Sequence, residues 1–293
     1  MIKVRNLTMR YSNGKGIFDL DFEVRKGEVV GFLGPNGAGK TSTIRCLLGF
    51  IQGQSGTCEI DDKNCFENAP EISKNIGFIA GEPAFPEGMT GVEYLEFLLE
   101  VRKGDDVMRN RMNELIKYFE FDPKGKIKRM SKGMKQKTAI VAAFMHSPDV
   151  YVLDEPTSGL DPVMQGRFVD LVMREKSNGK TILMSSHMFD EVEKTADFVI
   201  IIKDGRIVAK DKFAVLKQKQ KKIYFVQAVG VDKIEGFDMN KVGEDQAEFL
   251  VGANDIGKFI KEVSKLRIDV LTSKEVSLES IFMDYYVQHK EAK

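Results

Sequence analysis

The sequence predicts an α/β fold whose central sheet is largely parallel. Short apolar runs alternate with longer segments of helical periodicity from residue 1 to about residue 210, a pattern typical of strands joined by crossover helices. The chain has 293 residues, and at about 150 residues per domain a second domain is expected. The strands expected in the central sheet are residues 28–33, 76–80, 150–153, 181–184 and 198–202.

Residues 1–24 predict a separate antiparallel β subdomain. Apolar residues alternate there with polar ones, as expected for strands that have one buried and one solvated face. The apolar positions are Val4, Leu7, Met9, Phe18, Leu20, Phe22 and Val24.

The pattern becomes helical between Thr90 and about residue 144. Thr90 and Glu93 have the spacing of a capping box, and apolar residues follow at helical intervals. We therefore expect a helical insert at about residues 84–144 whose apolar stripe packs into the core. After Gly104 the apolar face of a second helix is expected to hold Met108, Met112, Leu115 and Phe119.

A small α+β accessory domain is expected at the C-terminal end of the chain. A basic stretch at residues 211–222 predicts a solvated linker between residues 1–210 and residues 223–293. In the smaller domain the pattern predicts strands and helices in a βαβα-like order. The expected strands are residues 223–229, 248–251 and 268–271, and the expected helices are residues 256–263 and 277–286.

Composition excludes several classes of protein. Lysine plus arginine number 44, as do aspartate plus glutamate, so the net charge is zero and binding to nucleic acid through bulk electrostatics is not expected. No apolar run approaches the roughly 18 residues that cross a bilayer. The N-terminus lacks the apolar core of a secretory signal, so a cytoplasmic location is expected. Cys46, Cys58 and Cys65 have no CxxC spacing and are expected to be reduced thiols.

Residues 34–41 read GPNGAGKT and fit the phosphate-binding pattern G-x-x-x-x-G-K-[ST]. The segment lies between an expected strand and an expected helix, which is the context in which this pattern forms a phosphate cradle. Its glycines let backbone N–H groups converge on an anion, while Lys40 and Thr41 are placed to contact the outer phosphates and Mg²⁺. The glycine order, followed by a Lys-Thr pair, favours a triphosphate over a dinucleotide.

Asp154 and Glu155 follow the buried strand at residues 150–153, at the carboxyl end where open α/β sheets bind ligands. Phosphoryl transfer needs a ligand for Mg²⁺ and a group that orients or deprotonates the attacking water. We assign Asp154 to the first task and Glu155 to the second. His187 follows the strand at residues 181–184 at the same edge, so a contact with the γ-phosphate is expected.

With these residues in place, the sequence resembles the ATP-binding subunit of an ABC transporter over residues 1 to about 210, and the implied fold is a P-loop NTPase of ABC type. LDEP at residues 153–156 matches the family's Walker B motif, SGLD at 158–161 its D-loop and His187 its switch histidine. MSKGM at residues 130–134 occupies the signature position, and Tyr11 the position at which the family stacks an aromatic ring on adenine. The Walker A motif matches Gly34, Pro35, Asn36, Gly37, Ala38, Gly39, Lys40, Thr41 and Ser42.

The resemblance implies that two such subunits enclose two ATP molecules, with Mg²⁺ as a cofactor. Ser131 and Gly133 would then contact the γ-phosphate across the interface, and Asp161 of the D-loop is assigned to the nucleotide site. The local sequence independently supports this role for Ser131. Its side chain can cap a helix that begins near Lys132, and the first N–H groups of that helix can bind an anion. The implied catalytic residues are Lys40, Glu155 and His187, and the implied magnesium ligands are Thr41 and Asp154.

The resemblance also implies partners. The second ATPase subunit would be an identical chain or a related paralogue, and the membrane-spanning permease subunits would be separate chains that contact a surface including residues 84–94. The chain would be a peripheral protein at the cytoplasmic face of the cell membrane, and no nucleic-acid partner is expected. VSLESIFMDYY at residues 276–286 resembles the end of the accessory domain of exporter-type members, which favours export over import.

Two positions depart from the family's pattern. In the signature, usually LSGGQ, Lys132 replaces the first glycine and Met134 replaces the glutamine. Gly81 stands where the family carries a glutamine that senses Mg²⁺ and the attacking water, so either Glu82 supplies an oxygen or this contact is lost. We expect slowed or retuned hydrolysis rather than none, because the other catalytic positions are intact.

Two alternative functions stay open at the level of sequence. A soluble, non-transport ABC ATPase acting on nucleic acid or ribosomes is disfavoured, because the chain has one cassette and no long coiled-coil insert. Aromatic residues also do not interleave with the basic residues of the stretch 124–137, as stacking on bases would require. A regulatory nucleotide-binding module without turnover is kept open by Gly81.

Overall fold

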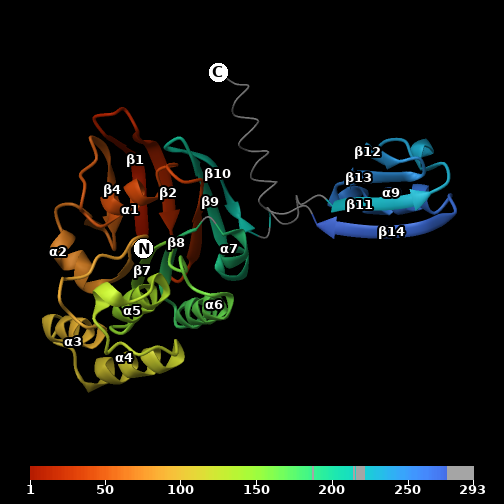
Figure 1. Ribbon diagram of the computed structural model, residues 1–293. Helices are drawn as coiled ribbons and strands as arrows, with labels where there is room; N and C mark the ends of the chain where they lie inside the picture. The colour runs from red at the N-terminus through yellow and green to blue at the C-terminus, as the bar shows by residue number, and fades with distance from the viewer. Residues whose placement is uncertain (187, 214, 216–221, 276–293) are drawn as a thin grey trace. The chain divides into compact units, whose positions relative to one another are not determined.

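The computed structural model describes residues 1–186, 188–213, 215 and 222–275. The chain divides into two compact units, Met1–Lys210 and Asp211–Lys293, and each is described separately (Figure 1). The helix predicted at residues 277–286 lies outside the described residues.

The first strands form an antiparallel sheet, as their alternating pattern predicts. The strands are β1 (Ile2–Arg10), β2 (Gly16–Val24), β4 (Ser55–Ile60) and β5 (Lys63–Asn64). Their order is β2-β1-β4-β5, and each pairing is antiparallel. Along β1, Arg5 and Arg10 are exposed, and the buried side chains are the alternating Ile2, Val4, Leu7 and Met9.

The second sheet of this unit is the predicted, largely parallel one. Its strands are β3 (Val29–Leu33), β6 (Ile76–Ile79), β7 (Val150–Asp154), β8 (Thr181–Ser186), β9 (Phe198–Lys203) and β10 (Arg206–Lys212). The order is β10-β9-β3-β8-β7-β6, and β3–β8, β3–β9, β7–β8 and β6–β7 are parallel pairs. The carboxyl ends of β3, β7 and β8 therefore meet at one edge of the sheet.

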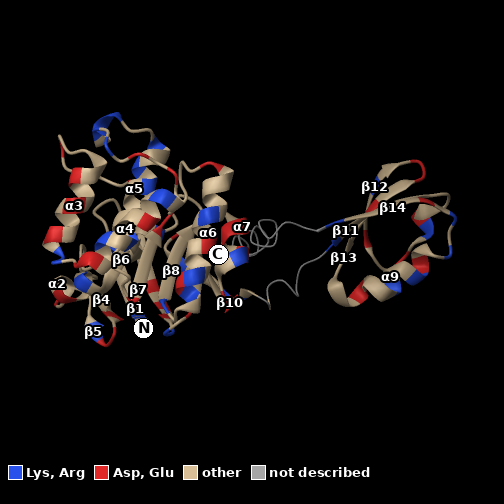
Figure 2. Ribbon diagram, turned by 90° about the horizontal axis from the view of Figure 1, so that it is seen from below, with Lys and Arg blue, Asp and Glu red and all other residues tan. Residues whose placement is uncertain are grey.

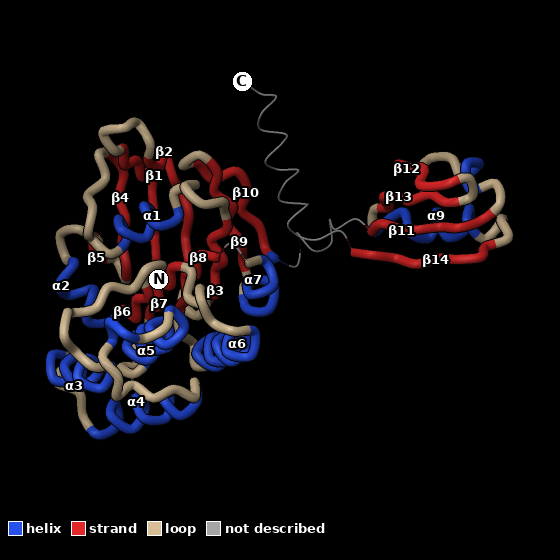
Figure 3. The backbone as a smooth tube through the Cα atoms, in the orientation of Figure 1, coloured by secondary structure: helices blue, strands red, loops and turns tan. Residues whose placement is uncertain are grey.

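Helices cover both faces of this sheet (Figure 3). On one face α1 (Lys40–Leu47) lies between the two sheets and shares a hydrophobic core with Val30 and Phe32 of β3. On the other face Gly31 lies against α7 (Phe189–Thr195), so closely that a Cβ at Gly31 would be 2.3 Å from Cγ1 of Val192. The remaining helices of the sheet region are α6 (Pro162–Ser177), the short α2 (Ala69–Ile72) and the 3₁₀ turn Ser73–Asn75.

The predicted helical insert is present and lies beside α6 at the end of the unit away from the antiparallel sheet (Figure 1). It contains α3 (Gly91–Val101), α4 (Asp106–Tyr118), the 3₁₀ turn Ile127–Arg129 and α5 (Lys132–Phe144). The capping box is confirmed: Glu93 N donates a 3.1 Å hydrogen bond to Thr90 Oγ1, and Thr90 N donates one of 2.7 Å to Glu93 Oε2. The buried positions of α4 are Met108, Met112 and Leu115, as the spacing predicts.

A buried ion pair fastens the insert to the sheet. Glu175 of α6 is 2% exposed, pairs with Arg111 of α4 and accepts a 2.8 Å hydrogen bond from the hydroxyl of Tyr151 in β7. Arg111 Nε also donates a 2.8 Å hydrogen bond to the carbonyl oxygen of Phe144 at the end of α5. These contacts hold α4 against α5 and α6. Removal of either partner of the ion pair would leave the buried charge of the other without compensation.

The unit Asp211–Lys293 contains a four-stranded sheet in the order β12-β13-β11-β14. Its elements are β11 (Lys222–Ala228), β12 (Asp238–Gly243), β13 (Gln246–Val251), α9 (Ile256–Val263), β14 (Ile268–Glu275) and the 3₁₀ turns Val231–Lys233 and Ala253–Asp255. Phe259 and Val263 of α9 pack on the sheet in a separate hydrophobic core. The βαβα-like prediction lacked β12, whose exposed residues show no alternation because this strand lies at the edge of the sheet.

Figure 2 shows acidic and basic residues interspersed along the helices and loops, consistent with the balanced charge. In the described part of the chain, no helix combines the length and the apolar character needed to span a bilayer. Cys46, Cys58 and Cys65 are free thiols in the core under the antiparallel sheet. Burial raises the pKa of Cys46 to about 12, which keeps its thiol protonated.

Candidate active site

The loop predicted to hold phosphates joins the end of β3 to the start of α1. Lys40, the first residue of α1, is only 5% exposed, and its Nζ donates a 2.7 Å hydrogen bond to the carbonyl oxygen of Gly34. The same Nζ lies 3.5 Å from Oε1 of Glu155. The loop therefore wraps around the ammonium group and holds it at the N-terminus of a helix, where partial positive charge already favours an anion.

Two glycines allow this loop to close so tightly. Gly39 has a φ of 114°, a left-handed conformation that only glycine adopts readily. At Gly34 a Cβ would lie 2.4 Å from the carbonyl oxygen of Ile202 in β9, so a side chain would push the loop off the sheet. A 2.9 Å hydrogen bond from the N–H of Gly205 to the carbonyl oxygen of Ala38 also fixes the loop.

The predicted magnesium ligands lie together at the ends of two elements. The hydroxyl of Thr41 in α1 donates a 2.7 Å hydrogen bond to Oδ2 of Asp154, the last residue of β7. Oδ1 of the same carboxylate accepts a hydrogen bond from the hydroxyl of Ser185 in β8. Asp154 is 3% exposed, so its two oxygens are oriented by neighbours on both sides.

Glu155, the predicted catalytic carboxylate, has a strained backbone. Its φ is 46°, in the left-handed region that non-glycine residues rarely adopt. The N–H of Glu155 donates to the carbonyl oxygen of Ser185 at 3.1 Å and also lies 3.2 Å from the hydroxyl oxygen of Ser185. This contact turns the chain sharply at the end of β7 and leaves the carboxylate beside Lys40.

Tyr11, predicted to stack on adenine, lies next to the phosphate-binding loop. Its hydroxyl oxygen is 3.3 Å from Oγ of Ser42 in α1, and its ring packs partly buried against the core. The turn after β1 is held by a 2.8 Å hydrogen bond from Tyr11 N to the carbonyl oxygen of Lys15. Tyr11 and Ser42 are thus neighbours, although Tyr11 belongs to the antiparallel sheet region.

The signature segment begins a helix, as predicted. Ser131 is the N-cap of α5, and its hydroxyl accepts a 3.2 Å hydrogen bond from the N–H of Met134. Lys132, which departs from the family pattern, donates a 2.8 Å hydrogen bond from Nζ to the hydroxyl of Ser158 in the D-loop. Gly133 also lies against the D-loop, since a Cβ there would be 2.8 Å from the carbonyl oxygen of Gly159.

The remaining predicted site residues are one in the D-loop, one after β8 and two in the loop after β6. Asp161 is the N-cap of α6 and accepts a 3.0 Å hydrogen bond from the N–H of Met164. His187 lies outside the described residues. Gly81 lies close to the carboxylate of Asp154, because a Cβ at this position would be 3.4 Å from Oδ2. Glu82, the residue that follows, is exposed.

Three polar residues that hold this site carry no motif in the sequence. Ser185 bonds both Asp154 and the N–H of Glu155. Gln136 of α5 is 1% exposed and donates a 2.6 Å hydrogen bond to the carbonyl oxygen of Pro156. Glu191 of α7 is 4% exposed. A sequence signal exists for Ser185, which lies in the otherwise apolar, buried strand β8, whereas Gln136 and Glu191 stand among charged residues and carry no such signal.

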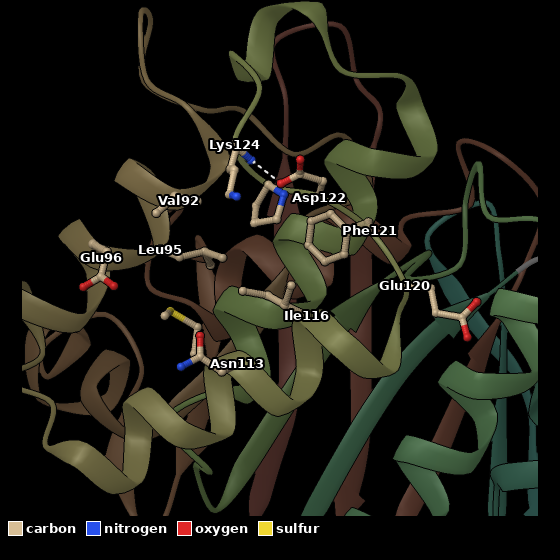
Figure 4. A pocket seen from close by; sticks show the side chains of 11 residues that line it. Val92, Leu95, Glu96, Asn113, Ile116, Glu120, Phe121, Asp122 and Lys124 are labelled. Carbon is tan, nitrogen blue, oxygen red and sulfur yellow. Dashed lines mark hydrogen bonds between the residues drawn. The ribbon is translucent and has the colours of Figure 1, made fainter.

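A separate pocket of about 460 Å³ lies within the helical insert, between α3, α4 and the segment that follows α4 (Figure 4). Its walls are apolar at Val92, Leu95 and Ile116, and Glu96 and Glu120 stand at its sides (Figure 4). Its lining has three acidic side chains, those of Glu96, Glu120 and Asp122, against one basic side chain, that of Lys124, so this pocket does not suit a nucleoside triphosphate. The residues that the sequence predicts to bind phosphate lie elsewhere, at the edge of the central sheet.

Comparison with known proteins gives consistent matches. A family model described as ABC transporter matches residues 17–158. The bacitracin transport ATP-binding protein BcrA of Bacillus licheniformis is 34% identical, over 97% of this chain and 96% of its own length. A fluoroquinolone export ATP-binding protein of Mycobacterium tuberculosis is 29% identical, over 97% of this chain and 92% of its own.

The fold is also found among solved structures. The structure of cbiO1 from Clostridium perfringens, described as part of the ABC transporter complex cbiONQ, matches with a TM-score of 0.61 and 27% identity. The match covers 74% of this chain and 92% of that one. With the phosphate-binding loop, the paired carboxylates and relatives matched over nearly their whole length, the chain belongs to the family of ABC transporter ATP-binding proteins.

Proposed function

We propose that the chain binds Mg-ATP at the edge formed by the ends of β3, β7 and β8, and that it hydrolyses the nucleotide there. The observation that carries this proposal is the convergence of an ammonium group, a hydroxyl and two carboxylates from separate elements. Lys40 lies 3.5 Å from Glu155, and Thr41 bonds Asp154 at 2.7 Å. Such a set suits phosphoryl transfer, whose catalysis consists mainly of positioning and charge stabilisation.

The residues present fit a magnesium ion. Thr41 and Asp154 offer hard oxygen ligands, and Mg²⁺ in phosphate sites takes one or two ligands from the protein and the rest from water and phosphate. Thr41 and Asp154 would hold the ion, with Ser185 orienting the carboxylate. When bound, Mg²⁺ neutralises negative charge on the phosphate oxygens.

Other side chains compensate charge, activate the attacking water and bind the rest of the nucleotide. Lys40 compensates charge on the outer phosphates, and Glu155 beside it orients the attacking water and accepts its proton. The N–H groups of the phosphate-binding loop, residues 34–42, hold the phosphate chain. Tyr11 stacks on the adenine ring, a role supported by its place beside Ser42. His187 contacts the γ-phosphate, as its place in the sequence after β8 suggests.

A second ATPase subunit completes the site. Ser131 caps α5, whose first turn contains no acidic residue, so the N–H groups of this turn can bind an anion. We propose that Ser131 and Gly133 of one subunit contact the γ-phosphate held by the other, with Asp161 of the D-loop at the same interface. The partner is a second copy of this chain or a related paralogue.

An apolar groove between the end of α1 and α3 is our candidate surface for a membrane-spanning permease. The groove has a volume of about 250 Å³, and its lining includes Phe50, Phe78, Tyr94 and Leu98. Phe50 is 65% exposed, and exposed aromatic residues around a groove mark binding surfaces. Phe85 of the loop before α3 contacts Tyr94 with ring centroids 5.1 Å apart, so residues 84–94 border the same surface.

Through this surface the chain would act at the cytoplasmic face of the membrane as a peripheral subunit. Binding of ATP between two subunits would close them, hydrolysis would reopen them, and the helical insert would transmit the movement to the permease. The relatives named for bacitracin transport and for fluoroquinolone export support a role in export.

Hydrolysis of Mg-ATP by the purified chain tests the proposed function. We expect turnover by the wild-type protein, loss of ATP binding in Lys40→Ala, and retained binding with at least about 100-fold slower turnover in Glu155→Gln, since a general base contributes about that much. If wild-type protein binds ATP but turns it over no faster than Glu155→Gln, the chain is a regulatory module and the proposal is wrong.

Purification from detergent-extracted membranes tests the permease contact. We expect an integral membrane protein to co-purify with the wild-type chain and to be lost from Phe50→Glu, which places a charge in the groove. Phe66→Glu is the matched control, because Phe66 is 45% exposed and does not line the groove. Equal recovery of the membrane protein with wild type and Phe50→Glu would exclude this surface.

A further inference from the structure

A buried carboxylate of α7 contacts two segments that border the proposed catalytic site. Glu191 accepts a hydrogen bond on Oε1 from the hydroxyl of Thr157, and one of 3.1 Å on Oε2 from the hydroxyl of Ser186. All three side chains are almost completely buried, with exposures of 4% for Glu191, 3% for Thr157 and 2% for Ser186. Both carboxylate oxygens are thus used to join the loop after β7 to the end of β8.

Each donor lies within two residues of a group that acts on ATP, or that orients such a group, in the proposed function. Thr157 follows Glu155 and Pro156 in the loop after β7. Ser186 is the last residue of β8, directly after Ser185, which bonds both Asp154 and the backbone of Glu155. A displacement of either hydroxyl would therefore move backbone that holds Glu155 in place.

The loop after β7 needs such support, because Glu155 has a left-handed φ of 46° that is unfavourable for a residue with a side chain. Strained backbone persists only where neighbouring contacts determine it. Gln136 of α5 supplies one contact, through its 2.6 Å hydrogen bond to the carbonyl oxygen of Pro156. Glu191 supplies a second through Thr157. The loop is thus fixed both to the helix that carries the signature segment and to α7.

We propose that Glu191 is a positioning residue for hydrolysis. By holding Thr157 against Ser186, it keeps the carboxylate of Glu155 directed toward the attacking water. This inference rests on the proposed function, because it concerns the same site. It predicts a selective effect. Lys40 is held by Gly34, and Thr41 bonds Asp154, and neither contact involves Glu191, so we expect the affinity for Mg-ATP to change much less than the turnover. Loss of these contacts misplaces the base and slows the chemical step.

Steady-state hydrolysis of Mg-ATP by the full chain tests this role. Glu191→Gln keeps the shape of the side chain, but its amide nitrogen cannot accept the second hydroxyl hydrogen bond. Thr157→Val removes the donor at nearly constant volume, and Thr157→Ser retains it. Asp190→Asn controls for the loss of a negative charge, since Asp190 is the exposed neighbour of Glu191 on α7. Thr181→Val controls for the replacement of a buried threonine, since Thr181 lies at the opposite end of β8.

We expect Glu191→Gln and Thr157→Val to lower kcat by about 10- to 100-fold, the effect of one lost hydrogen bond to a charged group, while KM for Mg-ATP stays within about twofold. Thr157→Ser should keep most of the wild-type kcat, and both controls should match the wild type. Thermal unfolding by circular dichroism identifies variants that fail to fold. If Glu191→Gln is among them, the two Thr157 variants decide the question.

Three results would overturn the inference. The first is an unchanged kcat in Thr157→Val, the second is equal loss in Thr157→Val and Thr157→Ser, and the third is a rise in KM that accounts for the whole loss of activity. Failure of the proposed function itself looks different, because the wild-type protein would then show no hydrolysis in the same assay.

Discussion

The hydroxyl of Thr41 donates a 2.7 Å hydrogen bond to Oδ2 of Asp154 and so joins the first turn of α1 to the end of β7. If these oxygens hold Mg²⁺, Thr41→Val should raise the Mg²⁺ concentration for half-maximal hydrolysis by about 10- to 100-fold, whereas Thr41→Ser should stay near the wild type. Titration of Mg²⁺ at fixed ATP measures the difference. An identical Mg²⁺ requirement in Thr41→Val and Thr41→Ser would contradict the assignment.

A side chain at Gly81 would face the carboxylate of Asp154, because a Cβ there would lie 3.4 Å from Oδ2. We expect Gly81→Gln to raise turnover by about fivefold and to change the Mg²⁺ dependence, since an amide oxygen at this place adds a hydrogen bond to the ion's water shell or to the attacking water. Gly125→Gln, at an open position in the insert, controls for adding a glutamine. Unchanged turnover and Mg²⁺ dependence in Gly81→Gln would refute the view that Gly81 slows or retunes the enzyme.

His146, to which the sequence assigns no role, should make stability depend on pH. Burial lowers its pKa from 6.5 to about 4, and the positive charge of Arg102 acts in the same direction. The unfolded chain takes up a proton near pH 6.5 but the folded chain only near pH 4, so stability is full above about pH 6.5 and falls by up to about 3 kcal/mol as the pH drops to about 4.

Urea unfolding at several pH values in this range checks the prediction. His146→Gln removes the titrating group and can still donate to the carbonyl oxygen of Ile76, which lies 3.1 Å from Nε2 of His146. We expect a flatter dependence of stability on pH for this variant. Parallel curves for the variant and the wild type would show that His146 is not the responsible group.

Phe259 lies at the centre of the smaller unit, with its ring centroid 4.9 Å from that of Tyr224 and 5.2 Å from those of Phe237 and Phe249. We propose that the unit Asp211–Lys293 folds as an independent domain. Phe259→Ala should then destabilise it by about 3–5 kcal/mol and leave ATP binding unchanged. Limited proteolysis of the full chain and nucleotide titration measure the two effects.

The control is Ile260→Ala, because Ile260 is the neighbouring residue of α9 and is 39% exposed. It should resist proteolysis like the wild type. Loss of ATP binding in Phe259→Ala together with unfolding of the smaller unit would show that the two units depend on each other.

Much of the fold can be predicted from the sequence because its strong signals are local. The run at residues 150–153 is continuously apolar and becomes the buried strand β7, and Thr90 and Glu93 form the capping box that their spacing predicts. β12 cannot be recognised in this way. Its residues are exposed, and pairing with β13 rather than burial makes Asp238–Gly243 a strand.

The sequence likewise predicts only part of the candidate site. The phosphate-binding loop and the Asp154–Glu155 pair are contiguous motifs, so the sequence identifies them. Ser185, Gln136 and Glu191 are ordinary polar residues whose partners lie far along the chain, and their contacts exist only once β7, β8, α5 and α7 have packed. The sequence therefore predicts which groups do the chemistry, but not which groups hold them in place.

A glycine at position 155 would relax the turn that follows β7, since glycine adopts a φ near 46° at little cost. The substitution would relieve about 1 kcal/mol of backbone strain, but it would also remove the base and the carboxylate that lies 3.5 Å from the buried ammonium of Lys40. Backbone strain and turnover therefore favour opposite residues at this one position. A screen for thermal survival alone does not select for the carboxylate, so directed evolution of this chain needs ATP consumption as a second criterion.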